Sequence, residues 1–581
     1  MASRASATKP PGVWRQLLDN PYIFGLSAGL EANRLRDADK FASLGGFLFG
    51  YDQGVVSGVL EMQSFAAEFP RIYVDSRFKG WFVSTLLLAA WLGSLVNGPV
   101  ADRFGRKGSM LAAVVVFTLG SALQAGAQTM AVLFGGRAVA GLAVGMLTMI
   151  VPMYMSEVST AGIRGTLVVL QQLSITLGIL VSYWLEYGTQ YIGGVRCAPD
   201  IPYTGGTHDR PKFDPRHDVG SPGHRCPGQS QAAWRVPFAL QIAPALILGI
   251  GMLFYPESPR YYLMRRQEDA ALRALAQLRR AEHPDSPCLR DEYLAIKAEV
   301  LFDESIARER FPGKAGPSLY FAQYGSLVAT KPAFRRLAVG CLIGFFQQFI
   351  GCNAMIYYSP IIFSQLGLSG GTTSLLATGV YGIVNTLSTL PALFLIDRVG
   401  RRPLLMCGAT GTFISLVIVG AILGAYGNNL LHHRAAGWVG IAFVYIYDVN
   451  FSYSFAPIGW VLPSEIFNLG NRSKAMALTT SCTWMCNFII GLVTPDMLES
   501  FGWGTYIFFA AFALLAFLFT WGFVPETKGK SLEDMDEIFG DAAARDEKQR
   551  LFTIAASLGL TAPMPTLDKI DVATADAREY A

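Results

Sequence analysis

Long apolar segments dominate this sequence and set what it can fold into. A helix that crosses a bilayer needs roughly 20 consecutive, mostly apolar residues, and the chain contains twelve candidates of that kind. Charged residues make up only 15% of the chain, compared with roughly 25% in an ordinary soluble domain. The pattern therefore predicts an all-α membrane protein with twelve transmembrane helices. Their centres lie near Gly50, Ala90, Val116, Val144, Leu177, Ala245, Gln348, Leu387, Val417, Ser452, Met485 and Ala513.

The loops between these segments carry their positive charge on one side. The loops after the second, fourth, eighth and tenth segments are short and basic, and they read DRFGRK, GIRG, DRVGRR and NRSK. The loops after the third, seventh and eleventh segments contain no Lys or Arg. By the positive-inside rule the basic loops are cytoplasmic. We therefore expect a multi-pass protein of the plasma membrane with both termini in the cytoplasm.

Polar regions divide the chain further. The stretch between the sixth and seventh segments contains RRQEDAALRALAQLRRA, which is rich in helix formers with mixed charge and predicts a cytoplasmic helical middle domain. Residues 29–40 (GLEANRLRDADK) separate an apolar lead-in from the first segment, and they are either an interfacial helix or an insertion from an imperfect gene model. The expected regions are an N-terminal segment, a six-helix half, a cytoplasmic linker, a second six-helix half and a cytoplasmic tail, at 1–40, 41–259, 260–336, 337–527 and 528–581.

Composition and motifs exclude several classes of protein. The formal net charge is only +4, so the total charge gives no case for nucleic-acid binding. The sequence has no phosphate-binding GxxxxGK and no paired cysteine motif with zinc spacing. We expect no cofactor and no metal, and no constellation of residues supports an enzyme. The expected state is a monomer in the lipid bilayer.

Three loop motifs occur twice, six segments apart. DRFGRK (102–107) follows the second segment and DRVGRR (397–402) follows the eighth. After the fourth segment, and again after the tenth, a glutamate precedes an arginine by seven residues. The motif PESPR ends the sixth segment, and PETKG ends the twelfth. Three coincidences in register make chance an unlikely source. The chain therefore consists of two halves of common design, which pack about an axis along the membrane normal with a site between them.

The repeated loops also place acids beside bases at the cytoplasmic helix ends. Ion pairs that form in one conformation and break in another bias a two-state rocking motion. Simple anchoring of basic loops in the cytoplasm is the alternative, and the presence of acids favours a gating role. The predicted gating residues are Asp102, Arg103, Arg106, Glu157, Arg164, Asp397, Arg398, Arg401, Glu465 and Arg472.

One carboxylate, Asp52, lies inside the apolar, glycine-rich first segment GGFLFGYDQGVVSG. An acid at mid-membrane costs roughly 2.5–3.5 kcal/mol on insertion scales, so it needs a partner. Arg137 in the fourth segment is the obvious one. An acid beside a guanidinium stays ionised, and it takes up a proton when movement separates the two groups. The pair is thus a candidate proton switch. Asp448 is a second acid within a segment, and we interpret it first as a helix–helix hydrogen-bonding group and second as a functional acid.

Taken in order, the motifs resemble those of sugar porters of the major facilitator superfamily, with the texture of fungal members. The matching text includes GGFLFGYDQGVVSG, DRFGRK, PMYMSEVSTAGIRG, PESPR, QQFIGCNAMIYYSP, DRVGRR, GWVLPSEIF and VPETKG. The resemblance covers nearly the whole membrane part. It implies the major facilitator fold, alternating access and a monosaccharide as the usual cargo.

The seventh segment offers side chains suited to a sugar. Amides supply both donors and acceptors to hydroxyl groups, and Gln347, Gln348 and Asn353 cluster there with Tyr357 after them. They converge best if the helix unwinds near Gly351, a common device at transporter sites. Hydrogen bonds that only join helices are the alternative. By resemblance, further sugar-binding or cavity-lining residues are Phe49, Gln172, Asn385, Trp460 and Trp484.

The resemblance leaves coupling and cargo open. Asp52 stands where proton symporters have an acid, but some fungal facilitators have it too, so a uniporter remains the alternative to a symporter. A sugar sensor is a further alternative, although the cytoplasmic tail is short for one. A polyol, a disaccharide or a sugar acid is also possible as cargo, and a sugar acid would require a cation in the cavity.

Two cysteines share the long loop after the fifth segment. Cys197 and Cys226 lie in this loop, which the topology places outside the cell. An oxidising exterior permits a disulfide, so we expect the two to be paired. Two free thiols are the alternative.

Overall fold

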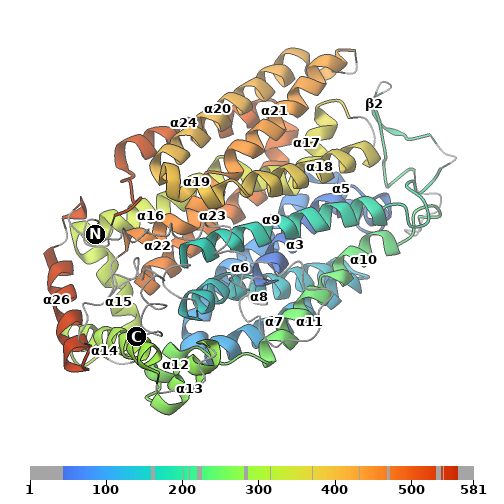
Figure 1. Cartoon of the computed structure of the whole chain (residues 1–581). Coiled ribbons are helices and arrows are strands. Elements are labelled where there is room, and N and C mark those ends of the chain that lie inside the picture. Colours follow the sequence, from blue (N-terminus) through green and yellow to red (C-terminus); the bar gives the residue numbers. More distant parts are fainter. Residues whose placement is uncertain are drawn as a thin grey trace, which may run out of the picture.

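The fold was analysed in a computed structural model of the chain, which shows a bundle of long helices (Figure 1). The structure describes residues 44–158, 164–199, 202–207, 210–218, 226–279, 286–314, 316–368, 371–430, 432–467, 472–530, 535, 538–540 and 542–560. The predicted N-terminal segment 1–40, with residues 29–40, lies outside these ranges. For Arg164 and Arg472 the helix is described but the side chain is not.

The helices follow the order of the predicted segments. In the amino-terminal half they are α3 (Leu44–Val59), α4 (Gln63–Glu68), α5 (Pro70–Val74), α6 (Ser76–Phe104), α7 (Arg106–Ala125), α8 (Met130–Val158), α9 (Arg164–Thr189), α10 (Ala232–Leu240) and α11 (Ile242–Leu253). In the carboxyl-terminal half they are α16 (Lys331–Phe349), α17 (Cys352–Gln365), α18 (Gly371–Thr389), α19 (Ala392–Val399), α20 (Arg401–Tyr426), η2 (Gly427–Asn429), α21 (Arg434–Ser452), α22 (Phe455–Ile466), α23 (Arg472–Ser500) and α24 (Gly504–Phe523).

Every predicted segment centre falls inside a helix. Within the described residues, nine helices are long and apolar enough to cross a membrane. The prediction of an all-α membrane fold is therefore confirmed, while the number of crossings stays a prediction. The bundle is held by buried apolar side chains from both halves, which form one continuous core.

Two smaller regions lie at opposite ends of the bundle. The linker helices α12 (Pro259–Met264), α13 (Glu268–Arg279), α14 (Pro287–Arg310) and α15 (Pro317–Ala329) gather at one end with the tail helix α26 (Ala542–Ser557) (Figure 1). The two-stranded hairpin of β1 (Gly205–Thr207) and β2 (Arg210–Lys212) lies at the other end. In the loop that contains this hairpin, Cys197 and Cys226 are joined by a disulfide with Cα atoms 4.5 Å apart.

The seventh predicted segment is broken at its middle. Helix α16 ends at Phe349, and Gly351 has a φ of 96° before α17 begins at Cys352. This is the left-handed region, which glycine adopts without steric cost. The prediction that the helix unwinds near Gly351 is confirmed. A second kink follows at Tyr358, whose φ of −120° and ψ of 19° are non-helical, two residues before Pro360.

The two halves meet chiefly along three helix pairs. Helix α3 packs against α17, α6 against α23, and α9 against α18. Side chains cross this boundary: Trp91 Nε1 donates to Ser481 Oγ at 2.8 Å, and Tyr183 Oη donates to the Ile356 carbonyl at 2.8 Å. The boundary is where a cavity between the halves has to lie.

Candidate functional site

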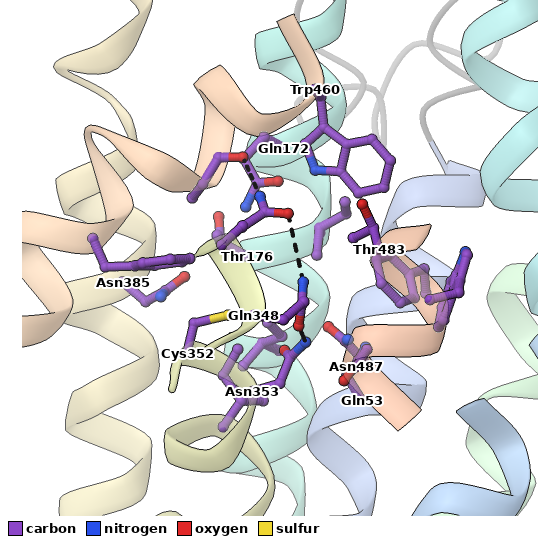
Figure 2. Close-up of a pocket in the computed structure, with 18 residues that line it drawn as sticks. Gln53, Gln172, Thr176, Gln348, Cys352, Asn353, Asn385, Trp460, Thr483 and Asn487 are labelled. Atoms are coloured by element: carbon purple, nitrogen blue, oxygen red, sulfur yellow. Dashed lines mark hydrogen bonds between the residues drawn. The ribbon is translucent and has the colours of Figure 1, made fainter. Parts of the chain in front are cut away.

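A pocket lies between the halves (Figure 2). All the predicted substrate-binding residues except Tyr357 line it. The lining side chains come from α3, α9, α16–α18 and α21–α23 and are Phe49, Gln53, Gln172, Ile175, Thr176, Ile179, Gln347, Gln348, Cys352, Asn353, Ile356, Asn385, Phe451, Ala456, Trp460, Thr483, Trp484 and Asn487.

Amides at the helix break form a connected row. Asn353 Nδ2 donates to Gln348 Oε1 at 2.5 Å, and Gln348 Nε2 lies 3.5 Å from Gln347 Oε1. Gln347 Nε2 donates in turn to the backbone carbonyls of Phe455 and Ala456, at 3.1 and 3.2 Å. These carbonyls follow the break between α21 and α22. Two irregular backbone segments therefore hold the row in place, and such segments are typical of transporter sites.

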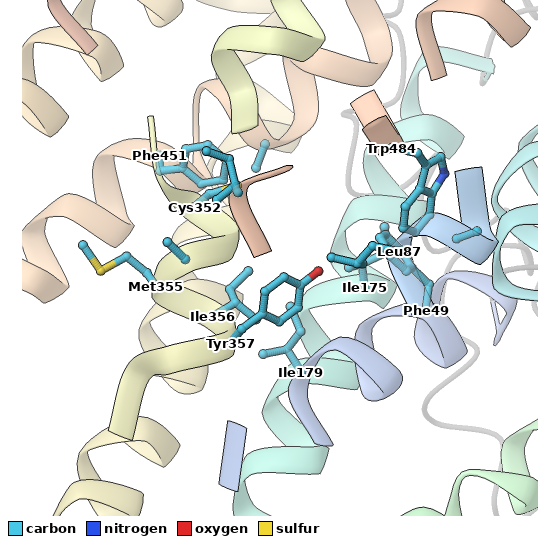
Figure 3. Close-up of a cluster of buried hydrophobic side chains, with 14 of the residues drawn as sticks. Phe49, Leu87, Ile175, Ile179, Cys352, Met355, Ile356, Tyr357, Phe451 and Trp484 are labelled. Atoms are coloured by element: carbon cyan, nitrogen blue, oxygen red, sulfur yellow. The ribbon is translucent and has the colours of Figure 1, made fainter. Parts of the chain in front are cut away.

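Apolar and aromatic side chains form the other walls of the pocket. Phe49 and Trp484 meet edge to face, with ring centroids 5.1 Å apart. Trp484 also donates from Nε1 to Thr148 Oγ1 at 3.3 Å, which fixes the indole across the two halves. Figure 3 shows Ile175, Ile179 and other apolar side chains around this pair. A ring of hydroxyls with apolar faces would meet both kinds of surface here.

Tyr357 lies behind the pocket rather than in its lining. Its hydroxyl accepts from Gln53 Nε2 at 3.0 Å and donates to Asn487 Oδ1 at 3.2 Å. Both partners line the pocket, although the sequence reasoning missed them. Helical spacing could have found them, because side chains three or four residues apart share a face. Gln53 is four residues after Phe49, and Asn487 is three residues after Trp484.

Asp52 and Arg137 meet in the interior of the amino-terminal half. Asp52 Oδ1 lies 3.6 Å from Arg137 Nη1, and both side chains are almost completely buried, at 0% and 2% exposed. Among the residues that the structure describes, the carboxylate oxygens have no hydrogen-bond partner, and Arg137 donates from Nη2 to the Val83 carbonyl at 3.3 Å. The pair is thus a close ion pair without a hydrogen bond. Gln53 is the chain neighbour of Asp52, so the pair adjoins the pocket.

The end of the amino-terminal half nearest the linker helices holds a cluster centred on Arg106. Its guanidinium donates to Glu157 at 3.0 Å and lies 3.6 Å from Asp102 Oδ1. Glu257, the acid of PESPR, accepts from the backbone N–H groups of Arg106 and Lys107 at 3.0 Å. Burial raises the pKa of Glu257, and these backbone donors oppose that rise. The carboxylate thereby caps the N-terminus of α7.

The carboxyl-terminal half repeats this cluster. Arg401 Nη2 lies 2.7 Å from Glu465 Oε1 and 3.0 Å from Asp397 Oδ1. Glu526, the acid of PETKG, accepts from the backbone N–H groups of Arg401 and Arg402 at 3.0 Å. The hydroxyl after each capping acid completes the match, because Ser258 donates to Glu157 and Thr527 donates to Glu465.

A glycine makes each of these clusters possible. Gly105 and Gly400 have φ values of 88° and 109°, where other residues are strained. A Cβ at Gly105 would come within 2.2 Å of Glu257 Oε2, and one at Gly400 within 2.6 Å of Glu526 Oε2. Two further predicted gating residues offer backbone groups: the carbonyl of Arg103 accepts from Arg265 at 2.6 Å, and that of Arg398 accepts from Lys528 Nζ at 2.5 Å.

The fold and the pocket define a class, the membrane carriers with a central site between two helical halves. Residues 40–539 match the family model described as "Sugar (and other) transporter". The chain therefore belongs to this family of the major facilitator superfamily, whose members are transporters rather than enzymes.

Individual relatives and solved structures agree with this assignment. A probable quinate permease of Aspergillus fumigatus is 32% identical over 509 residues, with 86% of each chain covered. The probable glucose transporter rco-3 of Neurospora crassa is 32% identical over 518 residues, covering 86% of this chain and 78% of the relative. The proton:xylose symporter XylE, solved with 6-bromo-6-deoxy-D-glucose, is 26% identical with a TM-score of 0.64, covering 86% of this chain and 98% of XylE.

Proposed function

We propose that the protein carries monosaccharides across the plasma membrane by alternating access, with a hexose such as glucose as cargo and a proton as coupling ion. The observation that carries the proposal is the pocket between the halves, which is lined by neutral amides, hydroxyls and aromatic rings. The residues assigned to sugar binding are Phe49, Gln172, Gln347, Gln348, Asn353, Asn385, Trp460 and Trp484, with Gln53 and Asn487 added and Tyr357 supporting them from behind.

The charge of the pocket favours a neutral cargo. Some relatives are named quinate permeases, and quinate carries a carboxylate. Among the described residues, no Lys, Arg or His lines the pocket. Buried anions require paired cations or several strong donors, and the nearby Arg137 is already beside Asp52. A neutral polyhydroxy ring therefore fits the lining better than a sugar acid does.

Asp52 is proposed as the proton carrier. Its carboxylate is buried beside Arg137 without a hydrogen bond, so a small displacement of either helix changes its electrostatic environment strongly. Coupling requires only that the sugar and the proton stabilise the same conformation. Gln53, the residue that follows Asp52 in α3, lines the pocket and donates to the Tyr357 hydroxyl.

The two cytoplasmic clusters are proposed as gating elements. Each joins the ends of three spanning helices of its own half through an arginine, a partly buried glutamate and a helix-capping acid. Each half therefore moves as one body, and the site between the halves opens to one side at a time. Both chain termini are proposed to be cytoplasmic, with the protein acting as a monomer.

Uptake in yeast cells that lack hexose transporters tests the proposal. Cells expressing the protein should take up labelled glucose, unlabelled glucose and xylose should compete, and quinate should not. The Gln347→Ala/Gln348→Ala variant, expressed at the same level, is the matched control and should lose uptake. Protein at the cell surface without uptake of any sugar would contradict the transporter proposal and favour a sensor. Uphill accumulation that a protonophore leaves unchanged would favour another coupling ion, and uptake that never exceeds the external concentration would favour a uniporter.

A further inference from the structure

A second buried acid lies beside the pocket and is not used by the proposed proton step. Asp448 in α21 is 0% exposed. Asn385 Nδ2 from α18 donates to Asp448 Oδ1 at 2.7 Å and to Ser452 Oγ at 3.2 Å. Ser452 also lies 3.4 Å from Asp448 Oδ1. Within the described residues, Asp448 forms no ion pair with a basic side chain.

These contacts fix which way the Asn385 amide faces. A carboxylate oxygen and an amide oxygen repel each other at hydrogen-bond distance, so the amide must present its NH₂ group to Asp448. The Asn385 oxygen is consequently turned the other way. It is buried and has no hydrogen-bond partner in the described part of the chain, and Asn385 lines the pocket. Figure 2 shows the amide at the edge of the pocket with its oxygen towards the other lining residues.

We propose that Asp448 is a positioning residue that locks the Asn385 amide, so that this edge of the pocket offers a hydrogen-bond acceptor to the cargo. The inference rests on the proposed sugar-binding function and deepens it. An acceptor selects a cargo hydroxyl that donates its proton, and it rejects a group that can only accept. A carboxylate of the cargo is also rejected at this edge, because its oxygens would face the oxygen of Asn385.

Glucose analogues with one hydroxyl replaced by fluorine test this polarity, because fluorine there cannot donate. The measured quantity is the apparent affinity of each analogue relative to glucose, from competition with labelled glucose uptake. In the wild-type protein, fluorine at one or more positions of the sugar ring should lower the apparent affinity about two- to tenfold. The Asp448→Asn variant can donate to the Asn385 oxygen, which allows the amide to turn round. It should relax the loss at that one position and leave the losses at other positions unchanged.

Two further variants complete the test. Asp448→Leu removes the acceptor and should also relax the loss of affinity at the same position, so either variant that reaches the membrane decides the question. Glu186→Gln is the matched control: Glu186 is also a completely buried acid, it accepts from the Gly58 N–H at 3.1 Å, and it does not line the pocket. The Glu186→Gln variant should leave the affinity of every analogue relative to glucose unchanged.

The outcomes separate this inference from the proposed function. If the wild-type protein carries no sugar, the proposed function fails first. If it carries glucose but fluorine is tolerated at every position, or the ratios of the Asp448 variants equal those of the wild type, the positioning role is overturned alone. A common shift of all analogues, without a change in their ratios, would likewise show that Asp448 serves only packing.

Discussion

The two halves of the molecule are alike at the Arg106 and Arg401 clusters and different in the middle of the bundle. Arg106 and Arg401 each pair with a glutamate and an aspartate at equivalent places in the repeat. The buried acids do not correspond in this way. Asp52 has a guanidinium 3.6 Å away and no hydrogen bond, whereas Asp448 has an amide at 2.7 Å and no ion pair within the described residues. The two halves thus share the ion-pair clusters that join their helix ends, but they differ in the environment of their buried acid.

This difference assigns distinct roles to the two acids. A carboxylate held only by the charge of Arg137 responds strongly when the distance to that charge changes. A carboxylate held by hydrogen bonds from Asn385 and Ser452 is fixed in direction, and it fixes its partners in return. We therefore expect Asp52 to act on protons and Asp448 to act on cargo orientation.

The largest expected effect is on coupling, and it distinguishes the two acids directly. Asp52→Asn should abolish uphill accumulation of sugar while downhill exchange persists, because the variant has no titratable group beside Arg137. Asp448→Asn should retain uphill accumulation. The measurement is the steady-state ratio of internal to external labelled glucose in energised cells, with and without a protonophore. Equal ratios in the two variants would remove the distinction.

The next largest effect is on stability. Arg137→Met leaves Asp52 buried without its cation, which typically costs about 3–5 kcal/mol. Asn385→Leu removes the amide donor at 2.7 Å from Asp448, which typically costs about 1–3 kcal/mol. Thermal unfolding of the purified variants in detergent should give the lower midpoint for Arg137→Met, and adding Asp52→Asn should recover most of its loss. A larger loss for Asn385→Leu would contradict the assignment of roles.

The cytoplasmic clusters provide the complementary test, because there the halves should respond alike. Glu157→Gln and Glu465→Gln each weaken the pair with the central arginine. Each should lower the maximum uptake rate by a similar factor, about fivefold for a modest coupling energy, with little change in apparent affinity. Uptake kinetics of the two variants at matched surface expression are the measurement. An effect of only one variant would show that the structural repeat is not a functional one.

The smallest expected effect concerns the Tyr357 hydroxyl, which lies behind the pocket. Tyr357→Phe removes the hydroxyl that joins Gln53 and Asn487 but keeps the ring. The apparent Michaelis constant for glucose should rise about threefold, as for one lost hydrogen bond, with the maximum rate unchanged. Concentration-dependent uptake measures this, and Tyr358→Phe serves as the control because Tyr358 donates to the Gly491 carbonyl instead. A larger effect of the control would place the connection elsewhere.

Much of the fold could be predicted from sequence because apolar length and loop charge are local signals. The break at Gly351 followed from a glycine beside convergent amides, and the helix–helix hydrogen bond of Asp448 followed from its place in an apolar segment. The repeated loops also predicted the acids and bases that meet in the two cytoplasmic clusters. Glu257 and Glu526 belong to the repeated motifs, but their roles as helix caps could be recognised only from the packing of the helix ends in the structure.

Which residues line the pocket and which lie behind them could not be predicted in the same way. Tyr357 lies behind Gln53 and Asn487 because α17 is kinked at Tyr358 and packs against α3, and neither feature is local in sequence. Glu186 was missed because it stands near the end of an apolar segment, where an acid is ordinary. Its burial arises from the close approach of α9 to Gly58, where a Cβ would come within 2.4 Å of its carboxylate.

The most direct test of the central claim is proton movement in sealed vesicles that contain only the purified protein. In the absence of any imposed gradient, adding glucose outside should produce an alkaline shift in the outer medium that matches sugar entry. The Asp52→Asn variant should give sugar exchange without that shift. Sugar entry at the wild-type rate with no proton movement, or an equal shift in Asp52→Asn, would contradict the assignment of Asp52 as the carrier.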